Sequence, residues 1–571
     1  MISIHAPTIR IILLLLAAAC TAPDVLAQAA DLVILNSTIH TMDSSRPSAT
    51  ALAIRENRIV YVGTDSGARV LIGDRTEVVD LAGKTVVPGF IESHGHLLGL
   101  GYSRHRLELG ETRSYEDMVR MVAKAVKRAR PGEWIQGRGW HQSRWDRPPV
   151  PEVKGFQTHE ALSAVSPDNP VWLRHASGHA GIANARAMEI AGVGPDTPSP
   201  PGGEIIRDTL GRATGIFVEL AQSIIGDAIA PPTNESDQKA LGTAVAECLS
   251  KGVTTFVDAG ADRRQIALYR ENADSGRLNM RIWAMVGGWD DIGREELFAA
   301  PPDRGTPGGF LTVRALKLSM DGALGSRSAW LMEPYTDDTT SYGLETLDPQ
   351  DLYEISVEAL RAGYQVCVHA IGDRANRETL DAYERAFAAN PAAAKDARFR
   401  IEHAQTLDER DIPRFARLGV IASMQGIHCT SDRPWVATRL GEARIAEGAY
   451  AWRKLRDAGA VIVNGTDTPV EPVDPLKCFY ASVTRQQPDG TPPGGFDPDQ
   501  KMTREEALRS YTIDAAYGIF EENERGSLRE GKLADLVVLS KDIMTIPAGE
   551  ILSTDVLATM VNVRFVFRRP G

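Results

Sequence analysis

The sequence predicts an α/β fold: a (β/α)8 TIM barrel with a small β-sandwich domain built from both termini and a large insertion after barrel strand 1. Three observations indicate this fold. Short apolar segments alternate with segments of helical period through the middle of the 571-residue chain. Both ends are rich in hairpin-like segments, and one connection in the middle is unusually long.

Eight apolar segments are the candidates for the barrel strands. They are KTVVPGFI (84–91), VTTFVDAG (253–260), MRIWAMVGG (280–288), VRALKLSM (313–320), YQVCVHAIG (364–372), FRIEHAQ (399–405), GVIASMQG (419–426) and AVIVNGTD (460–467). Between most of them lies an amphipathic stretch such as LYEISVEALRAG, which has the length and period of a return helix. Eight βα units in series predict a closed barrel.

Two further parts surround this barrel. Hairpin-like runs such as ALAIRENRIVYVG and TMVNVRFVFR, near opposite ends of the chain, predict one β-sandwich assembled from both termini. About 150 residues separate the first two strand candidates, too many for a βα loop, so they are expected to form a subdomain over the barrel mouth. The predicted boundaries are 30–87 and 511–571 for the sandwich, the latter including the last helix, and 88–510 for the barrel, with the insertion at about 100–235.

Residues 1–29 have the features of a secretory signal peptide. Arg10 precedes an apolar run of about nine residues, and small residues follow it. The run is too short to span a bilayer. We therefore expect an exported protein, periplasmic or secreted; lipid attachment at Cys20 and a buried N-terminal element are the alternatives. The four other cysteines are widely spaced and are expected to be buried thiols.

The composition argues against several classes of function. A net charge of -12 and a pI near 5.6 disfavour a nucleic-acid partner. No later segment is expected to form a stable membrane span. Glycine-rich loops for a dinucleotide or ATP are not evident, so no organic cofactor is expected. A small molecule is the expected substrate, and the sequence leaves a homo-oligomer open.

Polar side chains recur at the carboxyl ends of the predicted strands, where a barrel holds its functional residues. His94 and His96 end the first strand, and residues two apart share one face of a strand. Unrelated core polar groups are the alternative, but imidazole and carboxylate are the ligands that zinc and similar divalent ions prefer. The sequence therefore predicts a divalent metal site, with zinc as the expected ion. The later strands contribute Lys317, His369, His403 and Asp467.

This order of residues resembles the metal-dependent amidohydrolase superfamily over nearly the whole mature chain. VVPGFIESHGHL resembles the first-strand signature of that superfamily, and EGKLADLVVLS resembles its C-terminal return to the sandwich. The stretches ALKLSMDGALGSRSA, HAIGDRAN, RIEHAQ and GTDTPVEPVDP resemble its amidohydrolase-3 branch, which includes N-substituted formamide deformylases.

The resemblance implies a site for two ions. His94, His96 and Asp467 would bind the more buried ion, His369 and His403 would bind the other, and a carboxylated Lys317 would bridge them. Carboxylation suits this position because it replaces a desolvated ammonium group with an anion that cations stabilise. A single ion beside an unmodified Lys317 is the alternative.

The resemblance also implies a reaction. The expected function is hydrolysis of an amide-type, non-peptide C–N bond in a formamide, N-acyl or related compound, by a metal-activated hydroxide with Asp467 as general base. Hydrolysis of a cyclic amide, ester or lactone at the same site is the second hypothesis. A non-catalytic barrel scaffold is the third, and the presence of all six ligand positions disfavours it.

Five further residues are candidates for contact with the substrate. His179, in SGHAGIANARAM on an expected loop before a helix, is a candidate catalytic residue that would bond the substrate carbonyl or oxyanion, with a surface histidine as the alternative. Trp140 would form an aromatic wall or pack in a core. Arg327 would bind a carboxylate or form a structural ion pair. His428 would line the mouth, and His141 departs from the branch, where an aspartate is more usual.

Overall fold

The computed structural model describes residues 29–287, 293–305 and 309–570. Its central feature is an eight-stranded sheet in the order β8-β17-β18-β19-β20-β21-β22-β23, with every neighbouring pair parallel. The predicted TIM-barrel fold is therefore confirmed. The strands are β8 (Phe90–Gly95), β17 (Val253–Ala261), β18 (Arg281–Val286), β19 (Leu311–Ser319), β20 (Gln365–Ala370), β21 (Arg400–His403), β22 (Ile421–Met424) and β23 (Ile462–Asn464).

Backbone hydrogen bonds connect the first and last strands just beyond the end of β23. The amide of Asp467 donates to the carbonyl of His94 at 2.8 Å, and the amide of His96 donates to the carbonyl of Thr468 at 2.7 Å. Gly465 permits this approach, because a Cβ there would lie 2.6 Å from the backbone nitrogen of His94. The same contacts bring the predicted ligands of strands one and eight together.

The first predicted strand, 84–91, is wrong as a single element. Its first half is β7 (Thr85–Pro88), which pairs with β24 (Leu536–Leu539) in a different sheet, and only β8 belongs to the barrel. The chain changes sheets at Gly89. Both halves are buried and apolar, so the hydrophobic pattern does not reveal that the hydrogen-bonding partner changes.

Helices cover the outside of the barrel, and their ends follow from local sequence. Asp348 caps the start of α11, Pro349 occupies its first turn, and Gly363 ends it in the left-handed conformation. The outer helices include α2 (Leu97–Ser103), α7 (Asn234–Ser250), α8 (Arg263–Asp274), α10 (Arg294–Ala299), α11 (Pro349–Ala362), α12 (Asp373–Ala389), α13 (Pro391–Ala394), α14 (Ile412–Leu418), α16 (Trp452–Asp457), α17 (Pro475–Thr484) and α18 (Arg504–Ser510). Helix α15 (Gly426–Gly448) instead lies beside the ends of the strands and lines a cavity there.

The interior of the barrel is apolar at one level and polar above it. Trp283 and Cys367 belong to a buried cluster with Ile519, just after α19 (Ile513–Gly518). Residues two apart on a strand share a face, so Lys317 lies one layer above Ala315 and His369 one layer above Cys367. A packed apolar layer therefore lies beneath the polar residues at the carboxyl ends of the strands.

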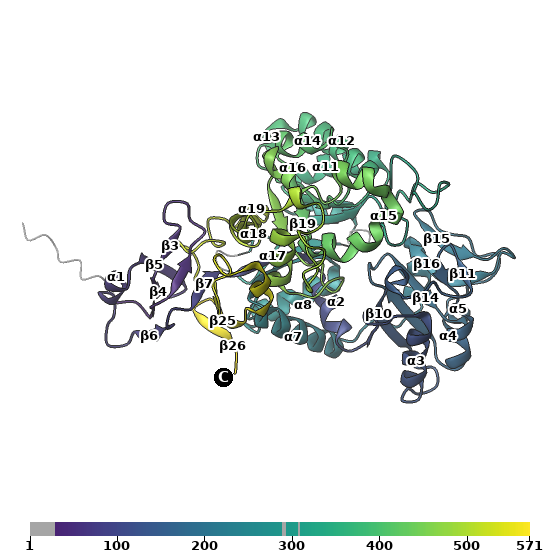
Figure 1. The fold of residues 1–571 in the computed structure, drawn as a ribbon, viewed down its shortest axis with the longest axis horizontal. Helices are drawn as coiled ribbons and strands as arrows, with labels where there is room; N and C mark the ends of the chain where they lie inside the picture. The colour runs from purple at the N-terminus through teal and green to yellow at the C-terminus, as the bar shows by residue number, and fades with distance from the viewer. Residues whose placement is uncertain (1–28, 288–292, 306–308, 571) are drawn as a thin grey trace, which may run out of the picture.

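Two smaller sheets lie beside the barrel, to the left in Figure 1. The six-stranded sheet β26-β25-β24-β7-β2-β3 combines strands from both ends of the chain, and a four-stranded sheet has the order β5-β4-β1-β6. One apolar cluster contains Ile34, Leu52 and Leu536 and so joins the two sheets. Their strands are β1 (Leu32–Leu35), β2 (Thr38–His40), β3 (Ser48–Ala49), β4 (Ala51–Arg55), β5 (Arg58–Gly63), β6 (Glu77–Asp80), β25 (Val556–Val561) and β26 (Arg564–Arg568), with helix α1 (Asp65–Arg69).

The segment of the chain that connects α2 to α7 forms a third sheet, which lies to the right in Figure 1. It has the order β15-β16-β14-β13-β10-β9 and its own apolar core, which includes Trp140. Its strands are β9 (Leu107–Glu108), β10 (Ile135–Trp140), β13 (Val171–His175), β14 (Ala180–Ala183), β15 (Gly203–Arg207) and β16 (Ala213–Glu219). The hairpin β11 (Glu152–Val153) and β12 (Phe156–Gln157) and helices α3 (Tyr115–Val126), α4 (Glu160–Val165), α5 (Ala185–Ile190) and α6 (Ser223–Gly226) complete this part.

Three other predictions concern cysteines, membranes and the signal peptide. Cys248, Cys367, Cys429 and Cys478 are buried free thiols, as expected. Among the described residues, the helices are all too short or too polar to cross a membrane. The predicted signal peptide lies, except for Ala29, outside the described residues.

Candidate metal centre

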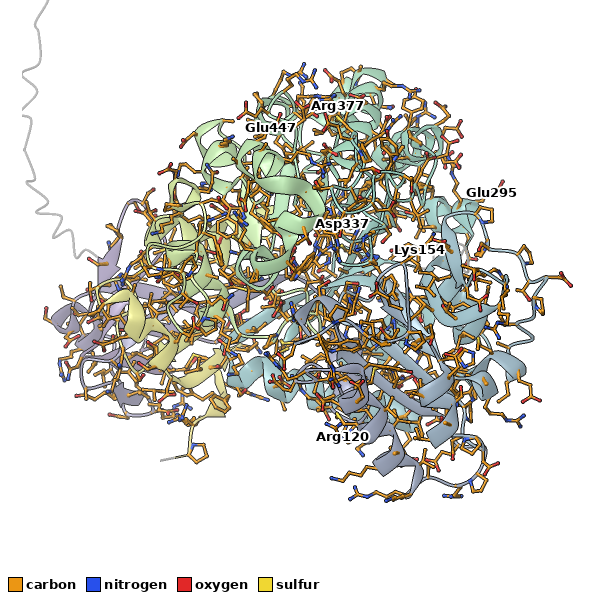
Figure 2. The ribbon with its side chains drawn as sticks, turned by 45° about the vertical axis from the view of Figure 1, so that its right-hand side comes forward. Arg120, Lys154, Glu295, Asp337, Arg377 and Glu447 are labelled. Atoms are coloured by element: carbon orange, nitrogen blue, oxygen red, sulfur yellow. The ribbon has the colours of Figure 1, made fainter. Side chains whose placement is uncertain are left out.

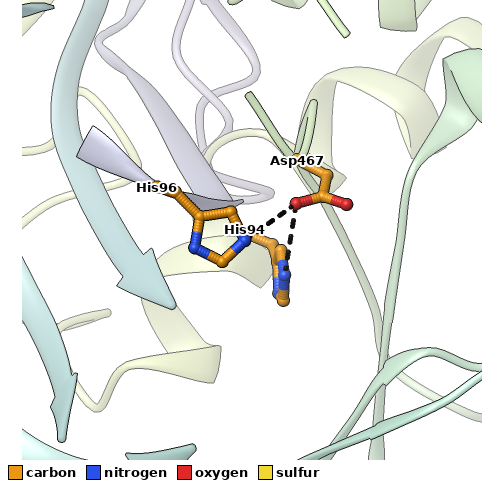
Figure 3. A group of neighbouring side chains, drawn as sticks. All are labelled: His94, His96 and Asp467. Carbon is orange, nitrogen blue, oxygen red and sulfur yellow. Dashed lines mark ion pairs between the residues drawn. The ribbon is translucent and has the colours of Figure 1, made fainter. Parts of the chain in front are cut away.

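His94, His96 and Asp467 converge at the carboxyl ends of the first and last barrel strands (Figure 3). Their ligand atoms all lie within 4.8 Å of one another. Oδ1 of Asp467 is 3.2 Å from Nε2 of His96 and 3.6 Å from Nε2 of His94. Two imidazole nitrogens and one carboxylate oxygen are thus directed at one small volume.

The unpaired atoms of this group suit a cation. Nε2 of His94 and Oδ1 of Asp467 are buried and have no hydrogen-bond partner in the described structure. Burial and the nearby Lys317 lower the pKa of His94 to about 4, so its ring is neutral at physiological pH and offers a lone pair. For Asp467, burial opposes ionisation, but the close approach of the His96 and His94 imidazoles holds its pKa well below the usual range.

His369 and His403 extend the group along the next two strands. Their ring centres are 4.5 Å apart, and the ring centre of His403 is 4.8 Å from that of His94. Nδ1 of His403 bonds to Oε1 of Gln425 at 2.7 Å, which leaves Nε2 for other contacts. The structure therefore brings four histidines and Asp467 together, although the tight three-ligand group does not include His369 or His403.

Lys317 faces the same interior from β19. Burial lowers its pKa, and Glu402 and Asp467 oppose this effect. Its charge adds to burial in lowering the pKa values of His94, His369 and His403. An ammonium group here is costly because it is desolvated among imidazoles.

Glu402 and Arg400 are buried neighbours of the candidate ligands that the sequence did not single out. Oε2 of Glu402 accepts a hydrogen bond from Nδ1 of His94 at 2.5 Å, and both side chains are fully buried. Nε of Arg400 donates to Oε1 of Glu402 at 2.7 Å. Burial would raise the pKa of Glu402, but the charge of Arg400 and the hydrogen bond from His94 hold it far below its usual value. The motif RIEH carried the only available signal, two charged residues inside a buried strand.

Asp321 is a second carboxyl group that the sequence did not single out. It accepts hydrogen bonds from the amides of Ile371 and Gly372, at 3.0 and 2.7 Å, and from Trp330 at 2.8 Å. Burial outweighs these bonds and raises the pKa of Asp321 to about 8. Oδ1 of Asp321 is 3.5 Å from Nε2 of His369. This residue therefore fixes the loop that follows β20 beside one of the candidate ligands.

His179 reaches the same cavity from the part of the chain between α2 and α7. It directly precedes strand β14, not a helix as expected. Its ring centre is 4.8 Å from that of His369, and its Nδ1 is 2.8 Å from Oε2 of Glu219. Burial disfavours the charged imidazole, but the charge of Glu219 and the bond to it raise the pKa of His179. Glu219 is a further residue that the sequence did not reveal.

A cavity of about 50 Å³ joins these residues to a wall of further polar groups. His141 and His428 line it, as do Trp435, Asp432 and Glu471. The ring of His141 lies 5.0 Å from that of Trp435, measured between ring centres. Nε2 of His428 and Oε1 of Glu471 are buried without a hydrogen-bond partner in the described structure. The wall therefore offers unsatisfied donors and acceptors to a bound molecule.

Trp140 and Arg327 do not line this cavity, so the structure does not support their expected substrate contacts. Trp140 is fully buried, and its indole nitrogen donates to the carbonyl of Leu173 at 2.9 Å. Arg327 forms a 2.9 Å ion pair with Asp337 and donates to the carbonyl of Lys154 at 3.1 Å. Figure 2 labels Asp337 and Lys154, the two contact partners of Arg327, near the middle of the view. Trp140 therefore packs in a core, and Arg327 forms a structural ion pair.

Three residues of the site have positive φ angles that non-glycine residues rarely adopt. The φ of Asp467 is 55°, that of His403 is 74° and that of Glu219 is 48°. Such conformations cost free energy, and they occur where the surrounding structure fixes a side chain in a required place. Here these conformations place the side chains of the candidate ligands His403 and Asp467 and the carboxylate of Glu219, which bonds to His179.

A closed barrel with histidines and carboxylates at the carboxyl ends of its strands belongs to the class of (β/α)8 metal-dependent hydrolases. More narrowly, the chain belongs to the amidohydrolase family, whose model matches residues 77–567. The protein LONG AFTER FAR-RED 3 of Arabidopsis thaliana is 35% identical over 548 residues, covering 93% of this chain and 91% of that protein.

Two other similarities span nearly the whole chain. An N-substituted formamide deformylase of Arthrobacter pascens is 29% identical over 561 residues, covering 96% of this chain and 100% of that enzyme. The crystal structure of an uncharacterized metal-dependent hydrolase from Pyrococcus furiosus matches with a TM-score of 0.70 at 29% identity. That match covers 90% of this chain and 100% of the other. The family implies a divalent metal and a small-molecule substrate.

Proposed function

We propose that this protein is a metal-dependent amidohydrolase that hydrolyses an amide-type, non-peptide C–N bond in a formamide, N-acyl or related small molecule. The observation that carries the proposal is the convergence of Nε2 of His94, Nε2 of His96 and Oδ1 of Asp467 at the barrel mouth. The name of the Arthrobacter pascens relative, an N-substituted formamide deformylase, supports the choice of bond.

The residues fit a centre for one or two divalent ions, with zinc as the proposed metal. His94, His96 and Asp467 would hold one ion, and His369 and His403 would hold a second, with Lys317 between them in carboxylated form. The metal would supply Lewis acidity, which lowers the pKa of a water molecule and polarises a carbonyl group. Carboxylation of Lys317 would remove the buried ammonium group, whose cost the lowered pKa of Lys317 reflects.

Asp467 is the proposed proton carrier. Oδ1 lies beside both histidine nitrogens, and the low pKa of Asp467 keeps the carboxylate ionised before the reaction. It would accept a proton from the attacking water and return it to the departing nitrogen, which leaves as a neutral amine. Attack would form a C–O bond at the carbonyl carbon, and departure of the protonated nitrogen would then break the C–N bond and leave a carboxylic acid.

His179 is the proposed donor to the substrate carbonyl oxygen. Glu219 accepts the hydrogen bond of Nδ1, so Nε2 is the nitrogen left to face the cavity. The raised pKa of His179 favours the protonated ring, which can stabilise negative charge on that oxygen. Glu402 would act indirectly by fixing the tautomer of His94, with Nδ1 protonated and Nε2 free.

A substrate panel combined with elemental analysis tests this proposal. Formamides, N-acyl amino acids and lactones would be assayed with the purified protein before and after chelation and after metal is restored. We expect one or two equivalents of metal and turnover of an amide-type substrate that chelation abolishes. Turnover of lactones alone would favour the second hypothesis, and activity that survives complete metal removal would contradict the proposal.

We also propose that the protein is exported by the signal peptide at residues 1–29. The supporting pattern is Arg10, the apolar run after it and the small residues before position 30. Cell fractionation and N-terminal sequencing of the mature protein test this proposal. A mature chain that still begins at Met1 in the cytoplasm would contradict it, and lipid on Cys20 would identify the lipoprotein alternative.

A further inference from the structure

A large groove lies outside the candidate metal centre, between the sheet of β9, β10 and β13 and the neighbouring helices α2 and α7. It measures about 1370 Å³, and Arg106 and Arg174 line it together with Tyr102. A smaller cavity of about 50 Å³ is lined by both arginines and by Arg138. Neither cavity shares a lining residue with the cavity that holds the candidate metal ligands.

Strand register places the three arginines on one face of the sheet. Arg138 on β10 pairs directly with Arg174 on β13, and Gly137 on β10 pairs with Leu107 on β9. Arg106, directly before β9, therefore stands beside Gln136 and on the same face as Arg138. The alternate residues of these strands, including Ile135 and Leu173, face the other side of the sheet and are buried in an apolar core. The arginine face is thus a consequence of the alternation that builds this core.

The three guanidinium groups have no carboxylate within ion-pair distance in the described part of the chain. Arg138 donates to the carbonyl of Ala176 at 2.7 Å, and Arg174 donates to that of Gly178 at 2.9 Å. Nε of Arg138 is buried and has no hydrogen-bond partner in the described structure. Arg106 lies 4.8 Å over the ring of Tyr102. Several N–H donors therefore stay available on positively charged groups.

The three guanidinium groups also repel one another. Like charges directly opposite each other on paired strands are destabilising. Burial and the charge of Arg174 lower the pKa of Arg138 to about 10, and Arg106 contributes to the lowered pKa of Arg174. The carboxylates of Glu108, Glu219 and Asp467 act on this cluster only from a longer range. The groove therefore has an excess of positive charge at a place where a ligand can enter from solvent.

We propose that Arg106, Arg138 and Arg174 form an oxyanion-binding site that takes the carboxylate or phosphate group of a small molecule. Guanidinium groups bind both anions through paired N–H donors, and a concave site between protein walls concentrates the positive potential. Arg138 and Arg174 also hold the carbonyls of the loop that leads to His179, so an anion here would contact the support of that residue. The site is distinct from the metal centre and does not depend on the proposed hydrolysis.

Calorimetric titration of the full-length, metal-containing protein with inorganic phosphate, and separately with succinate, tests the site. We expect saturable binding of at least one anion that weakens as the salt concentration rises. Tighter binding of phosphate would identify a phosphorylated ligand, and tighter binding of succinate would identify a carboxylate ligand. Absence of saturable binding of either anion at low ionic strength would overturn the proposal.

Matched variants locate the binding. Arg106→Gln and Arg174→Gln each remove one charge from the cluster and should weaken binding at least tenfold. Arg128→Gln removes the same charge from the lining of the same groove, outside the cluster, and should change the affinity less than twofold. If the cluster variants bind as tightly as the parent protein, the anion occupies the metal centre or another place, and the proposal is wrong. Equal weakening of anion binding by all three variants would also overturn the proposal, because it would indicate a general electrostatic attraction and not a specific site.

Discussion

Glu402 on β21 accepts a 2.5 Å hydrogen bond from Nδ1 of His94 on β8, and Arg400 donates to both carboxylate oxygens of Glu402. This chain of contacts directs Nε2 of His94 toward Asp467. Groups that orient a histidine ligand in this way typically change metal affinity 10–100-fold when they are removed. We therefore expect Glu402→Gln to weaken metal binding by about that factor, measured by competition with a chromogenic chelator.

The control for this prediction must separate orientation from stability, because Glu402→Gln also leaves a buried arginine without its carboxylate. Asp535→Asn removes a carboxylate from another fully buried ion pair, Arg281–Asp535, far along the chain from the ligands. It should lower the stability to a similar degree but leave metal affinity unchanged. Equal loss of metal affinity in both variants would show that general destabilisation is the cause.

Asp467→Asn tests the proton carrier. The amide keeps the size of the side chain but cannot accept a proton at neutral pH, so kcat should fall by roughly 10²–10⁴-fold. Metal content must be measured in the same sample, because Asp467 is also a candidate ligand. A variant with full metal occupancy and a kcat near that of the parent would assign the proton transfer to another group.

Glu219→Gln tests whether Glu219 positions His179. The neutral amide would weaken the 2.8 Å bond to Nδ1 and remove the charge that raises the pKa of His179. We expect kcat to fall by about tenfold or more with a smaller change in KM, since the bond to the carbonyl oxygen strengthens in the transition state. The pH at which activity declines on the alkaline side should shift downward.

Glu204→Gln is the matched control, because Glu204 lies on neighbouring strand β15 and pairs with Lys154 at the exposed surface. It should retain parental kcat, KM and pH profile. A parental pH profile for Glu219→Gln with an unchanged kcat would contradict the positioning role.

Much of this architecture is local in the sequence, which is why it could be predicted. Seven of the eight strand candidates each coincide with one barrel strand, because each has its own apolar run and turn signals, and the first candidate overlaps β8 only at its end. His369 and His403 could be found for the same reason, since each lies at the carboxyl end of such a run. The exchange of sheets at Gly89 could not, because hydrogen-bonding partners leave no trace in hydrophobic periodicity.

The contacts between distant segments of the chain could not be predicted from the sequence either. Glu402 and His94 are 308 positions apart, and Arg138 and Arg174 meet only through the register of β10 and β13. Whether Trp140 lines a pocket or a core depends on which side of its strand faces the insertion core, and one sequence does not fix that side. The boundaries of the signal peptide and the domains stay predictions from sequence.

Trp140→Phe tests the structural role of Trp140. The change removes the 2.9 Å bond to the carbonyl of Leu173 and opens a small void in a fully buried position, so we expect a loss of about 1–3 kcal/mol of stability. KM should not change, because Trp140 does not line the cavity. Trp435→Phe, in the cavity wall, should change KM instead; a KM effect in Trp140→Phe alone would restore the aromatic-wall hypothesis.

Asp535 should make the stability of the fold depend on pH. Nε of Arg281 donates to Oδ2 of Asp535 at 2.7 Å, and the two side chains are 1% and 3% exposed. Burial would raise the pKa of Asp535, but the charge of Arg281 and its hydrogen bonds lower it below the ordinary value. A carboxyl group with a lowered folded-state pKa stabilises the fold above the unfolded-state pKa of about 3.9, and the stabilisation is lost as the pH falls through the folded-state value.

The Asp535→Asn variant should therefore be less stable than the parent at pH 7, by about 3–5 kcal/mol, because the guanidinium stays buried. Below pH 4 the difference should shrink, since the parent loses the same charge by protonation. The double variant Arg281→Met with Asp535→Leu removes both buried charges and should recover most of the loss. Thermal midpoints measured from pH 3 to 8 would check all three expectations, and a pH-independent difference between Asp535→Asn and the parent would mean that folding does not lower the pKa of Asp535.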